Sequence, residues 1–392
     1  MIEISNLRKY RRGGVVRLEA DITFDGIPSP YAEKTLYFEV ADADYDMLAD
    51  DTYDAFVLVP LYLAMYHKQD LHIRGNISKK LYQNIKWYIQ RILCDFSNEL
   101  TPINFSADGF TFNKSKGNLI GTGISCGVDS MSTIYDHFIK ETDPVYKINS
   151  LFLFNCGTHG DFEDPFTQKL FIERYKRNVN AADELGLPVH LVTSNVHAFT
   201  HKIGEQKVGF FAIYSCILSL QNVIFRYYTS SGLNYPKAKN FRQLYHNFDM
   251  AGFCESYLVP LIQTENLELI IDGCQYRRVD KLKNIADWEI AQKHLNVCVS
   301  HLPDASNCGH CPKCLRTLLP LEIMGKLDKF SRVFNIEQYK VISFNYKVDC
   351  LQKYDKSAFE TEAVDFAREN NFPMPIKTAC YVLGNNAVIV NG

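Results

Sequence analysis

The chain has 392 residues, of which 46% are apolar and 13% aromatic, so it can bury at least one full core and form two or three structural units. Its formal net charge is −3, which excludes a global positive field that attracts nucleic acid or an anionic membrane. The chain starts without a basic stretch followed by an apolar one, so we expect no secretory signal and a cytoplasmic protein. The apolar stretches 56–66 and 209–225 are shorter than the ~20 residues that a bilayer span needs, and buried helices explain both.

The first 115 residues differ in pattern from the rest. Residues 15–24 and 34–40 are rich in β-forming side chains, which predicts strands, whereas 53–67 and 79–94 read as helices. We therefore expect an N-terminal α+β domain over 1–115, which could serve as a docking surface for a partner or substrate. An acidic run inside it is interpreted as a solvated loop and helix start rather than a metal site: Asp42, Asp44, Asp46, Asp50, Asp51 and Asp54.

From about residue 117 short apolar stretches alternate with helical ones, as a parallel sheet covered on both faces requires. This rhythm predicts a doubly wound α/β domain over 116–325 with a five-stranded parallel sheet. Ligands on such a sheet bind at the carboxyl ends of its strands. The remaining residues, 326–392, form a C-terminal extension whose pattern indicates no function. The five expected strands are 118–124, 150–156, 189–196, 224–230 and 268–271.

Residues 119–130 lead from the first of these strands, through a loop of small residues, into a helix that we expect to begin near Met131. Unpaired N–H groups at a helix N-terminus attract anions, and the helix dipole adds to this. Ser125 and Ser130 can donate hydrogen bonds to phosphate oxygens, Gly127 allows close backbone approach, and Asp129 can hold a magnesium ion. No Gly-Lys-Ser/Thr closes the loop, which excludes a Walker A motif.

The pattern Ser-x-Gly-x-Asp-Ser at a strand-to-helix turn resembles the PP-loop of the ATP pyrophosphatases, which include asparagine and GMP synthetases, tRNA thiolases and 7-cyano-7-deazaguanine synthases. The resemblance implies the fold of the adenine nucleotide alpha hydrolases (HUP fold). The usual form has Gly where this chain has Cys126, and a small side chain fits there if its φ is negative. A persulfide role for Cys126 stays open. The resemblance implies catalytic roles for Asp129 and Ser130 and ATP binding by Ser125, Cys126, Gly127, Val128, Asp129 and Ser130.

Four cysteines stand as C-x9-C-x2-C-x2-C: Cys298, Cys308, Cys311 and Cys314. This spacing places thiolates around one tetrahedral ion, and four thiolates leave no open position, so we predict a structural zinc. An iron–sulfur cluster and a redox-active pair remain alternatives, because sulfur-only sites also suit these. His310 lies between two of the cysteines and is expected at the surface rather than on the metal.

A PP-loop followed by Cys-x9-Cys-Gly-x-Cys-Pro-x-Cys-Leu-Arg is similar to the QueC family, the 7-cyano-7-deazaguanine synthases, over about 118–317. Residues 152–159 also look like that family's second strand and turn. The resemblance implies a ligase that uses Mg-ATP to adenylate the carboxylate of 7-carboxy-7-deazaguanine, releases pyrophosphate and joins the acyl group to ammonia, giving an amide or a nitrile. Arg277, Arg278 and Lys281 follow the last strand, and we expect Lys281 in catalysis and Arg278 on the phosphates, with a solvated basic helix start as the alternative.

Partners and competing functions follow from the same residues. Some QueC-like proteins belong to antiviral defence operons and pass the activated deazaguanine to a protein amine, which makes a protein acceptor an alternative to ammonia. A sulfurtransferase would need sulfur on Cys126, Cys156 or Cys274, and a nucleotide-binding module without turnover is the third reading. A homo-oligomer is expected on general grounds only. Weaker site candidates are His159, His197, His201, His246, Tyr227 and Tyr228.

Overall fold

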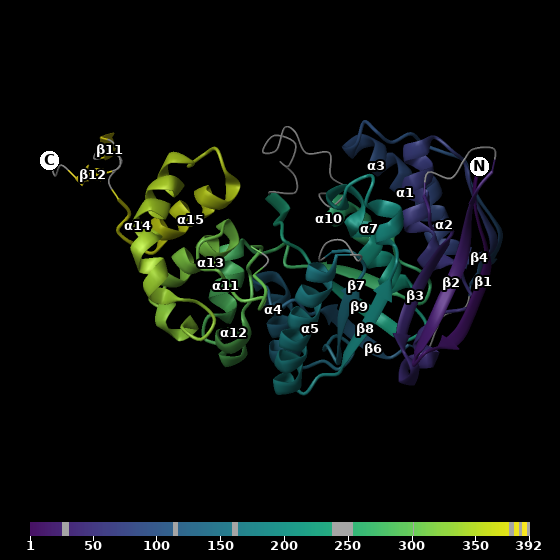
Figure 1. The fold of residues 1–392 in the computed structure, drawn as a ribbon, viewed down its shortest axis with the longest axis horizontal. Coiled ribbons are helices and arrows are strands. Elements are labelled where there is room, and N and C mark those ends of the chain that lie inside the picture. The colour runs from purple at the N-terminus through teal and green to yellow at the C-terminus, as the bar shows by residue number, and fades with distance from the viewer. Residues whose placement is uncertain are drawn as a thin grey trace.

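The computed structural model describes residues 1–25, 31–112, 117–158, 164–236, 254–300, 302–375, 380–383 and 386–389. It is an α/β protein built on one mixed ten-stranded sheet, in the order β10-β9-β6-β7-β8-β3-β2-β1-β4-β5. The sheet fills one side of the molecule and the C-terminal helices the other, with a two-stranded hairpin at the far end (Figure 1). That hairpin pairs β11 (Cys380–Leu383) with β12 (Asn386–Ile389).

The five strands predicted from the alternating pattern are all present and parallel to one another. The first of them, β6, is central, with β7 and β8 on one side and β9 and β10 on the other. The chain therefore reverses its direction of travel across the sheet between β6 and β9, and the crevice at such a point is where open α/β sheets bind ligands. The bounds are β6 Leu119–Gly123, β7 Ser150–Asn155, β8 Val189–Ser194, β9 Ile224–Ser230 and β10 Glu268–Asp272.

The expected five-stranded sheet is wrong in its extent, because the sheet continues past β8 into the N-terminal residues. The link is antiparallel, with Phe38 opposite Ser194 and Glu39 opposite Thr193. Two of the added strands were predicted, whereas the other three were not, because their polar residues obscure the alternation. The division into 1–115, 116–325 and 326–392 stays a prediction, although strands on both sides of residue 115 share one sheet. The added strands are β1 Ile2–Arg12, β2 Val15–Phe24, β3 Thr35–Ala41, β4 Leu71–Ser78 and β5 Phe105–Thr111.

Helices cover both parts of the sheet, and in the described residues none is long and apolar enough to cross a bilayer. The part of the chain that the structure describes also contains six short 3₁₀ or π segments: η1 Asp42–Met47, η2 Asp54–Phe56, η3 Ile85–Ile89, η4 Tyr135–Lys140, η6 Val259–Leu261 and η7 Leu327–Phe330. The α-helices are α1 Leu58–His67, α2 Lys79–Asn84, α3 Gln90–Phe96, α4 Val128–Ile134, α5 Pro165–Leu185, α6 His197–Thr200, α7 Glu205–Leu218, α10 Glu255–Leu258, α11 Arg278–Ile285, α12 Glu289–His294, α13 Pro312–Ile323, α14 Ile336–Gln352 and α15 Ala358–Glu369.

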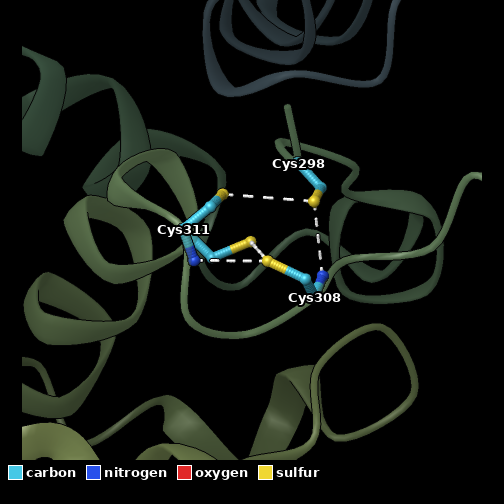
Figure 2. A group of neighbouring side chains, drawn as sticks. Cys298, Cys308 and Cys311 are labelled. Atoms are coloured by element: carbon cyan, nitrogen blue, oxygen red, sulfur yellow. Dashed lines mark hydrogen bonds between the residues drawn. The ribbon is translucent and has the colours of Figure 1, made fainter. Parts of the chain in front are cut away.

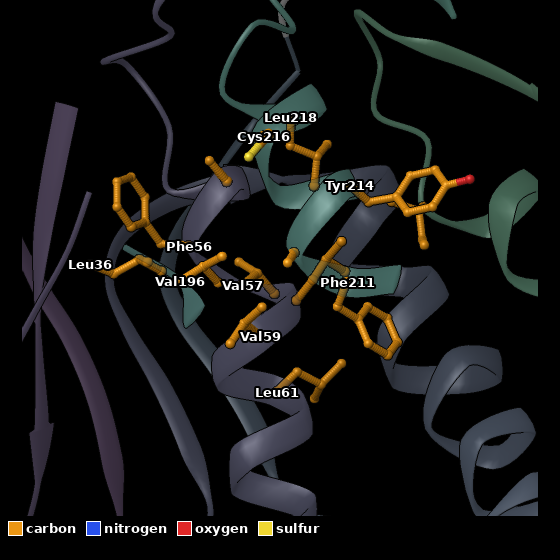
Figure 3. Close-up of a cluster of buried hydrophobic side chains, with 14 of the residues drawn as sticks. Leu36, Phe56, Val57, Val59, Leu61, Val196, Phe211, Tyr214, Cys216 and Leu218 are labelled. Atoms are coloured by element: carbon orange, nitrogen blue, oxygen red, sulfur yellow. The ribbon is translucent and has the colours of Figure 1, made fainter. Parts of the chain in front are cut away.

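The main core lies where α1 and α7 pack together on the sheet. Phe56, Val57 and Leu61 are buried beside Phe211 of α7, as Figure 3 shows. Burial on nearly all sides accounts for the continuous apolar run of α1, and it confirms the buried-helix interpretation of 56–66. The second stretch, 209–225, is helical only to Leu218, the end of α7, and its last two residues belong to β9.

One residue of the acidic run departs from the prediction of a solvated loop. Asp54 is buried, and it accepts hydrogen bonds from the backbone N–H of Ser78 and from Nε2 of Gln221, each at 2.8 Å. Burial raises the pKa of Asp54 to about 6. The carboxyl group thus joins the N-terminal residues to the end of α7, a role that a single-residue pattern cannot reveal.

The end of β10 is tied to α4 by a second buried carboxylate. Asp272 accepts hydrogen bonds from Thr133 Oγ1 at 2.6 Å and from His137 Nε2 at 3.2 Å. The His137 ring stacks on Tyr228, with 3.8 Å between ring centroids. Burial by itself raises the pKa of Asp272, but the bonds from His137 and Thr133 outweigh it and set the pKa at about 2.

We expect Asp272→Asn to lower the free energy of unfolding by about 2 kcal/mol at pH 7, since the carboxylate is favoured in the folded state. The pKa is depressed on folding, so this stabilisation is present above about pH 4 and is lost as pH falls towards 2. Urea unfolding of both proteins at pH 7 and pH 3 checks this, with the exposed Asp183→Asn as control. Equal losses at both pH values would contradict the assignment.

Candidate functional site

The loop predicted to bind phosphate connects β6 to α4, which begins at Val128, three residues before the expected start. We call residues 125–130 the phosphate loop. Its two serines face each other, with 3.1 Å between Ser125 Oγ and Ser130 Oγ. Ser130 Oγ also donates to the carbonyl oxygen of Gly127 at 3.2 Å, and the N–H of Gly127 donates to Ser125 Oγ at 3.4 Å. Hydrogen bonds of the two serine hydroxyl groups therefore hold the loop in shape. The loop lies at the start of a helix, and that position suits an anion.

Cys126 adopts a left-handed backbone conformation with φ of +55°, so the condition of a negative φ, under which a small side chain fits without strain, is not met. The turn from strand to helix requires this conformation, which costs a non-glycine residue about 1–2 kcal/mol. The side chain is buried, and the carbonyl oxygen accepts a hydrogen bond from the N–H of Asn296 at 2.7 Å. Burial raises the pKa of the Cys126 thiol to about 12, which argues against a persulfide carrier, since sulfur chemistry needs the thiolate.

Replacing Cys126 by glycine is expected to keep catalytic turnover within about threefold of wild type, because glycine adopts a positive φ freely. The relief of backbone strain and the loss of the buried thiol should nearly cancel in the free energy of unfolding. Cys126→Val is the matched control, and it should destabilise the protein, because a β-branched residue strains this backbone. Loss of activity with intact folding in Cys126→Gly would instead assign chemistry to the thiol.

Asp129 is held by two cations. Arg278 Nη1 lies 2.8 Å from its Oδ2, and Lys281 Nζ lies 2.9 Å from its Oδ1. Burial raises the pKa of Asp129, but Arg278 and Lys281 outweigh burial, so the pKa lies below its usual value. Asp129 is therefore a carboxylate at neutral pH, as a magnesium ligand must be.

Lys281 lies behind the loop rather than in a cavity. Its side chain is 1% exposed and also donates to the carbonyl oxygen of Ser231. Gly273 has a φ of +83°, which favours glycine, and a Cβ added there would lie 2.9 Å from Lys281 Nζ and push the ammonium group aside. The structure thus gives Lys281 the position of a residue that orients Asp129.

The two neighbouring arginines point to different partners. Arg278 contacts Asp129, whereas Arg277 forms ion pairs with Asp280 and with Glu369 of α15, each at 2.9 Å or less. Arg277 therefore links α11 to the C-terminal helices and does not face the phosphate loop.

A cavity of about 330 Å³ opens on one side of the phosphate loop, and we call it the cationic cavity. Burial lowers the pKa of Arg174, and lost solvation together with Arg278 lowers that of Lys313, so a bound anion would relieve the crowding of like charges. The sequence analysis did not single out three of its cations, Arg174, Arg177 and Lys313. Two signals were present, because Arg174 and Arg177 are three residues apart on one helix face and Lys313 lies between two of the clustered cysteines. The basic side chains lining it are Arg174 and Arg177 from α5, Arg278 from α11 and Lys313 from α13.

A second cavity, of about 350 Å³, opens on the other side of the loop, and we call it the aromatic cavity. Tyr227, one of the weaker site candidates, lines this cavity, whereas Tyr228 does not, because its ring stacks on His137. The two cavities share residues of the loop and its surroundings: Ser125, Asp129, Ser130, Thr158 and Asn178. The other ring-bearing walls are Phe152, Phe154, Phe210 and Tyr214.

The remaining candidates lie elsewhere. His197 and His201 lie together on and just after α6, with ring centroids 5.6 Å apart, and line neither cavity. His159 and His246 lie outside the described residues. Cys156 is buried beside Cys216, and Cys274 is buried too, so neither thiol lines a described cavity.

The four predicted metal ligands do meet, and we call them the cysteine cluster. Their Sγ atoms all lie within 4.8 Å of one another, with 4.0 Å between Cys308 and Cys314 and between Cys298 and Cys311. Figure 2 shows the sulfur atoms of Cys298, Cys308 and Cys311 turned towards one another. A tetrahedral ion with bonds of about 2.3 Å to sulfur needs sulfur–sulfur edges near 3.8 Å, so the cluster could hold a metal such as zinc.

His310 is not among these ligands. Its Nδ1 lies 2.8 Å from the carbonyl oxygen of Cys308, so the ring is engaged by the backbone of the turn. Backbone N–H groups of Cys308 and Cys311 instead donate to cluster sulfurs, at 3.4 and 3.2 Å. Such bonds stabilise thiolates, which is the ligand form.

The cluster also forms part of the cavity wall. Cys298 lines the cationic cavity, together with Asn296 and Val297 just before it and Lys313 between two of the ligands. Because the N–H of Asn296 donates to the carbonyl oxygen of Cys126, the cysteine cluster is joined to the phosphate loop by one backbone hydrogen bond.

Comparisons of the chain with protein-family models, with curated proteins and with solved structures found no significant match.

Proposed function

We propose that this protein is an ATP-dependent ligase that adenylates the carboxylate of a planar heteroaromatic acid, releases pyrophosphate and joins the acyl group to an amine. One observation carries the proposal: the phosphate loop lies at the carboxyl end of β6, between a cationic cavity and an aromatic one. The first suits a polyphosphate and the second a flat ring. The QueC-like motifs favour 7-carboxy-7-deazaguanine as the acid, with ammonia or a protein amine as acceptor.

The sheet supports the assignment of the ATP pyrophosphatase fold to the parallel half. In its strand order β6 is central and the phosphate loop follows directly, at the reversal point of the sheet, which supports an anion site there. The first-turn N–H groups of α4 then face the phosphates, as in other nucleotide sites built on this principle.

The chemistry needs charge stabilisation more than a covalent catalyst. A carboxylate oxygen attacks the α-phosphorus, the bond to the bridging oxygen breaks, and pyrophosphate leaves with the electron pair. The cations of the cationic cavity and the hydroxyls of Ser125 and Ser130 stabilise the charge that builds on the departing group. The amine then attacks the acyl carbon and loses a proton to solvent, and AMP leaves.

Asp129 would hold the magnesium ion, which supplies further charge neutralisation when bound. Each Asp129 oxygen already accepts from one cation, and a carboxylate oxygen keeps a second acceptor position, so the residue fits this role. We assign zinc to the cysteine cluster as a structural ion, because four thiolates leave no open position for a water nucleophile.

Sulfur transfer has less support than ligation. Cys126, Cys156 and Cys274 are all buried, and in the described residues neither cavity exposes their sulfur to a ligand. A sulfur carrier must alternate between donor and acceptor, which requires access.

The test is pyrophosphate and AMP release from Mg-ATP, with and without 7-carboxy-7-deazaguanine, followed by mass spectrometry of the products. Release that depends on the acid is the expected result, and benzoate serves as a control carboxylate without the fused ring. The product mass separates an amide, a nitrile and a protein adduct. Equal release with and without the acid would overturn the assignment of this substrate.

A further inference from the structure

Glu255 stands out in the wall of the aromatic cavity. Apart from Asp129 of the phosphate loop, it is the one charged side chain among the described residues that line this cavity. It is the first residue of α10, and neither its spacing nor its neighbours mark it in the sequence. A carboxyl group in a largely apolar wall needs a partner, because a desolvated acceptor without one is costly.

Within the described part of the chain, the side chains that reach Glu255 leave acceptor positions of its carboxylate unfilled. Ser231 and Tyr214 lie within hydrogen-bonding reach of Glu255. Each hydroxyl group has only one hydrogen to donate, and each has another acceptor that competes with Glu255 for it. Ser231 donates to the carbonyl oxygen of Leu233 at 3.2 Å, and Tyr214 donates to Thr229 Oγ1 at 2.9 Å. A carboxylate has about four acceptor positions, so at least two remain for a ligand.

The surroundings of Glu255 disfavour its charged form. Burial, with a smaller contribution from Asp129, raises the pKa of Glu255 to about 7, although Ser231 and Lys281 act to lower it. Two N–H donors from a ligand would favour the charged form and strengthen the contact.

The rest of the cavity suits a flat ring system. Phe154, Phe210 and Tyr227 supply ring walls, and about 350 Å³ lies within the usual range for small-molecule sites. Since Ser125, Asp129 and Ser130 line both cavities, a carboxylate on such a ring would point to the phosphates.

We infer that the aromatic cavity binds the ring of the acid substrate and that Glu255 selects a ring with two adjacent N–H donors, the 2-amino-4-oxopyrimidine edge of guanine-type bases. The two carboxylate oxygens pair with the ring N–H and the amino N–H. An adenine-type edge offers one donor beside an acceptor whose lone pair faces the second oxygen, so the base of ATP is rejected there. The inference rests on the proposed function only in assigning the acid to this cavity.

The first experiment measures base binding without nucleotide, by calorimetry on the full chain, with guanine, hypoxanthine and adenine. Hypoxanthine lacks the 2-amino group, so its affinity relative to guanine measures the contribution of the amino N–H donor. Guanine should bind at least tenfold tighter than either. In Glu255→Gln this preference should fall to about threefold or less, because the amide turns a donor towards one of the ring donors. The exposed Glu289→Gln is the matched control and should keep the wild-type preference.

Steady-state kinetics then shows whether the aromatic cavity binds the ring of the acid or the adenine base of ATP. Glu255→Gln should raise the KM for the acid at least tenfold and leave the KM for ATP unchanged. An equal rise in both KM values, or equal binding of guanine and hypoxanthine by the wild type, overturns the inference. Should Glu255→Gln fail to fold, Glu255→Asp replaces it, and a retained guanine preference at lower affinity supports the inference whereas loss of that preference overturns it.

The outcomes also distinguish this inference from the proposed function. Guanine selectivity that depends on Glu255, without acid-dependent pyrophosphate release, leaves the inference standing and removes the ligase. Acid-dependent release without guanine selectivity does the reverse.

Discussion

Replacing Asp129 by asparagine is expected to lower pyrophosphate release by about 10²–10³-fold, the usual effect of removing one preorganised charge at a reacting centre. The carboxylate is the group that the structure offers to a magnesium ion, and it also orients Arg278. The side chain keeps its size in this variant, so the loss reports charge. Release is measured with saturating acid and Mg-ATP, and nucleotide binding is measured separately.

The same variant should lose about 3–5 kcal/mol of stability, because Lys281 is left as a buried cation without its partner. The double variant Asp129→Asn with Lys281→Met removes that cation and should recover most of the stability without recovering activity. Asp280→Asn, whose carboxylate pairs with Arg277 away from both cavities, is the matched control and should keep its activity. Turnover in Asp129→Asn close to wild type would remove the residue from catalysis, and binding without turnover in the wild type would favour a nucleotide-binding module.

Removal of metal from the cysteine cluster is expected to lower the free energy of unfolding by about 3 kcal/mol or more, since binding energy at such sites is also folding energy. It should also weaken nucleotide binding at least tenfold, because the segment with Cys298 and Asn296 forms a wall of the cationic cavity and is hydrogen-bonded to the phosphate loop. Native mass spectrometry gives the metal content, and hydrogen exchange over residues 295–316 gives the loosening of the segment.

Cys314→Ser should reproduce the effect of the chelator on metal content, stability and nucleotide affinity. Cys94→Ser is its control, because Cys94 is half-buried and far from the cluster in sequence and contacts. Full nucleotide affinity after complete loss of metal would show that the cluster supports folding alone. If the purified protein contains iron and absorbs visible light, the cysteine cluster holds an iron–sulfur cluster and not zinc.

Short-range patterns determined much of this protein by themselves. The parallel strands follow from apolar stretches that recur with helices between them, and the strand over 224–230 was placed to the residue. The phosphate loop and the cysteine cluster are also local, since each is confined to a few turns of chain, where spacing limits how far apart side chains can lie. This is why local spacing alone predicts that the four cysteines meet and makes Ser125 and Asp129 site candidates.

The tertiary structure decided everything that joins distant segments. Phe38 lies opposite Ser194 because the edge strands β3 and β8 pair with each other. The alternation of side chains within a strand does not predict which strand it pairs with. The cationic cavity needs Arg174, Arg278 and Lys313 from three helices, and an isolated basic residue in a sequence is indistinguishable from a solvated one. Glu255 and the left-handed Cys126 belong to the same class, because burial, partner and backbone angle are set by packing and not by residue type.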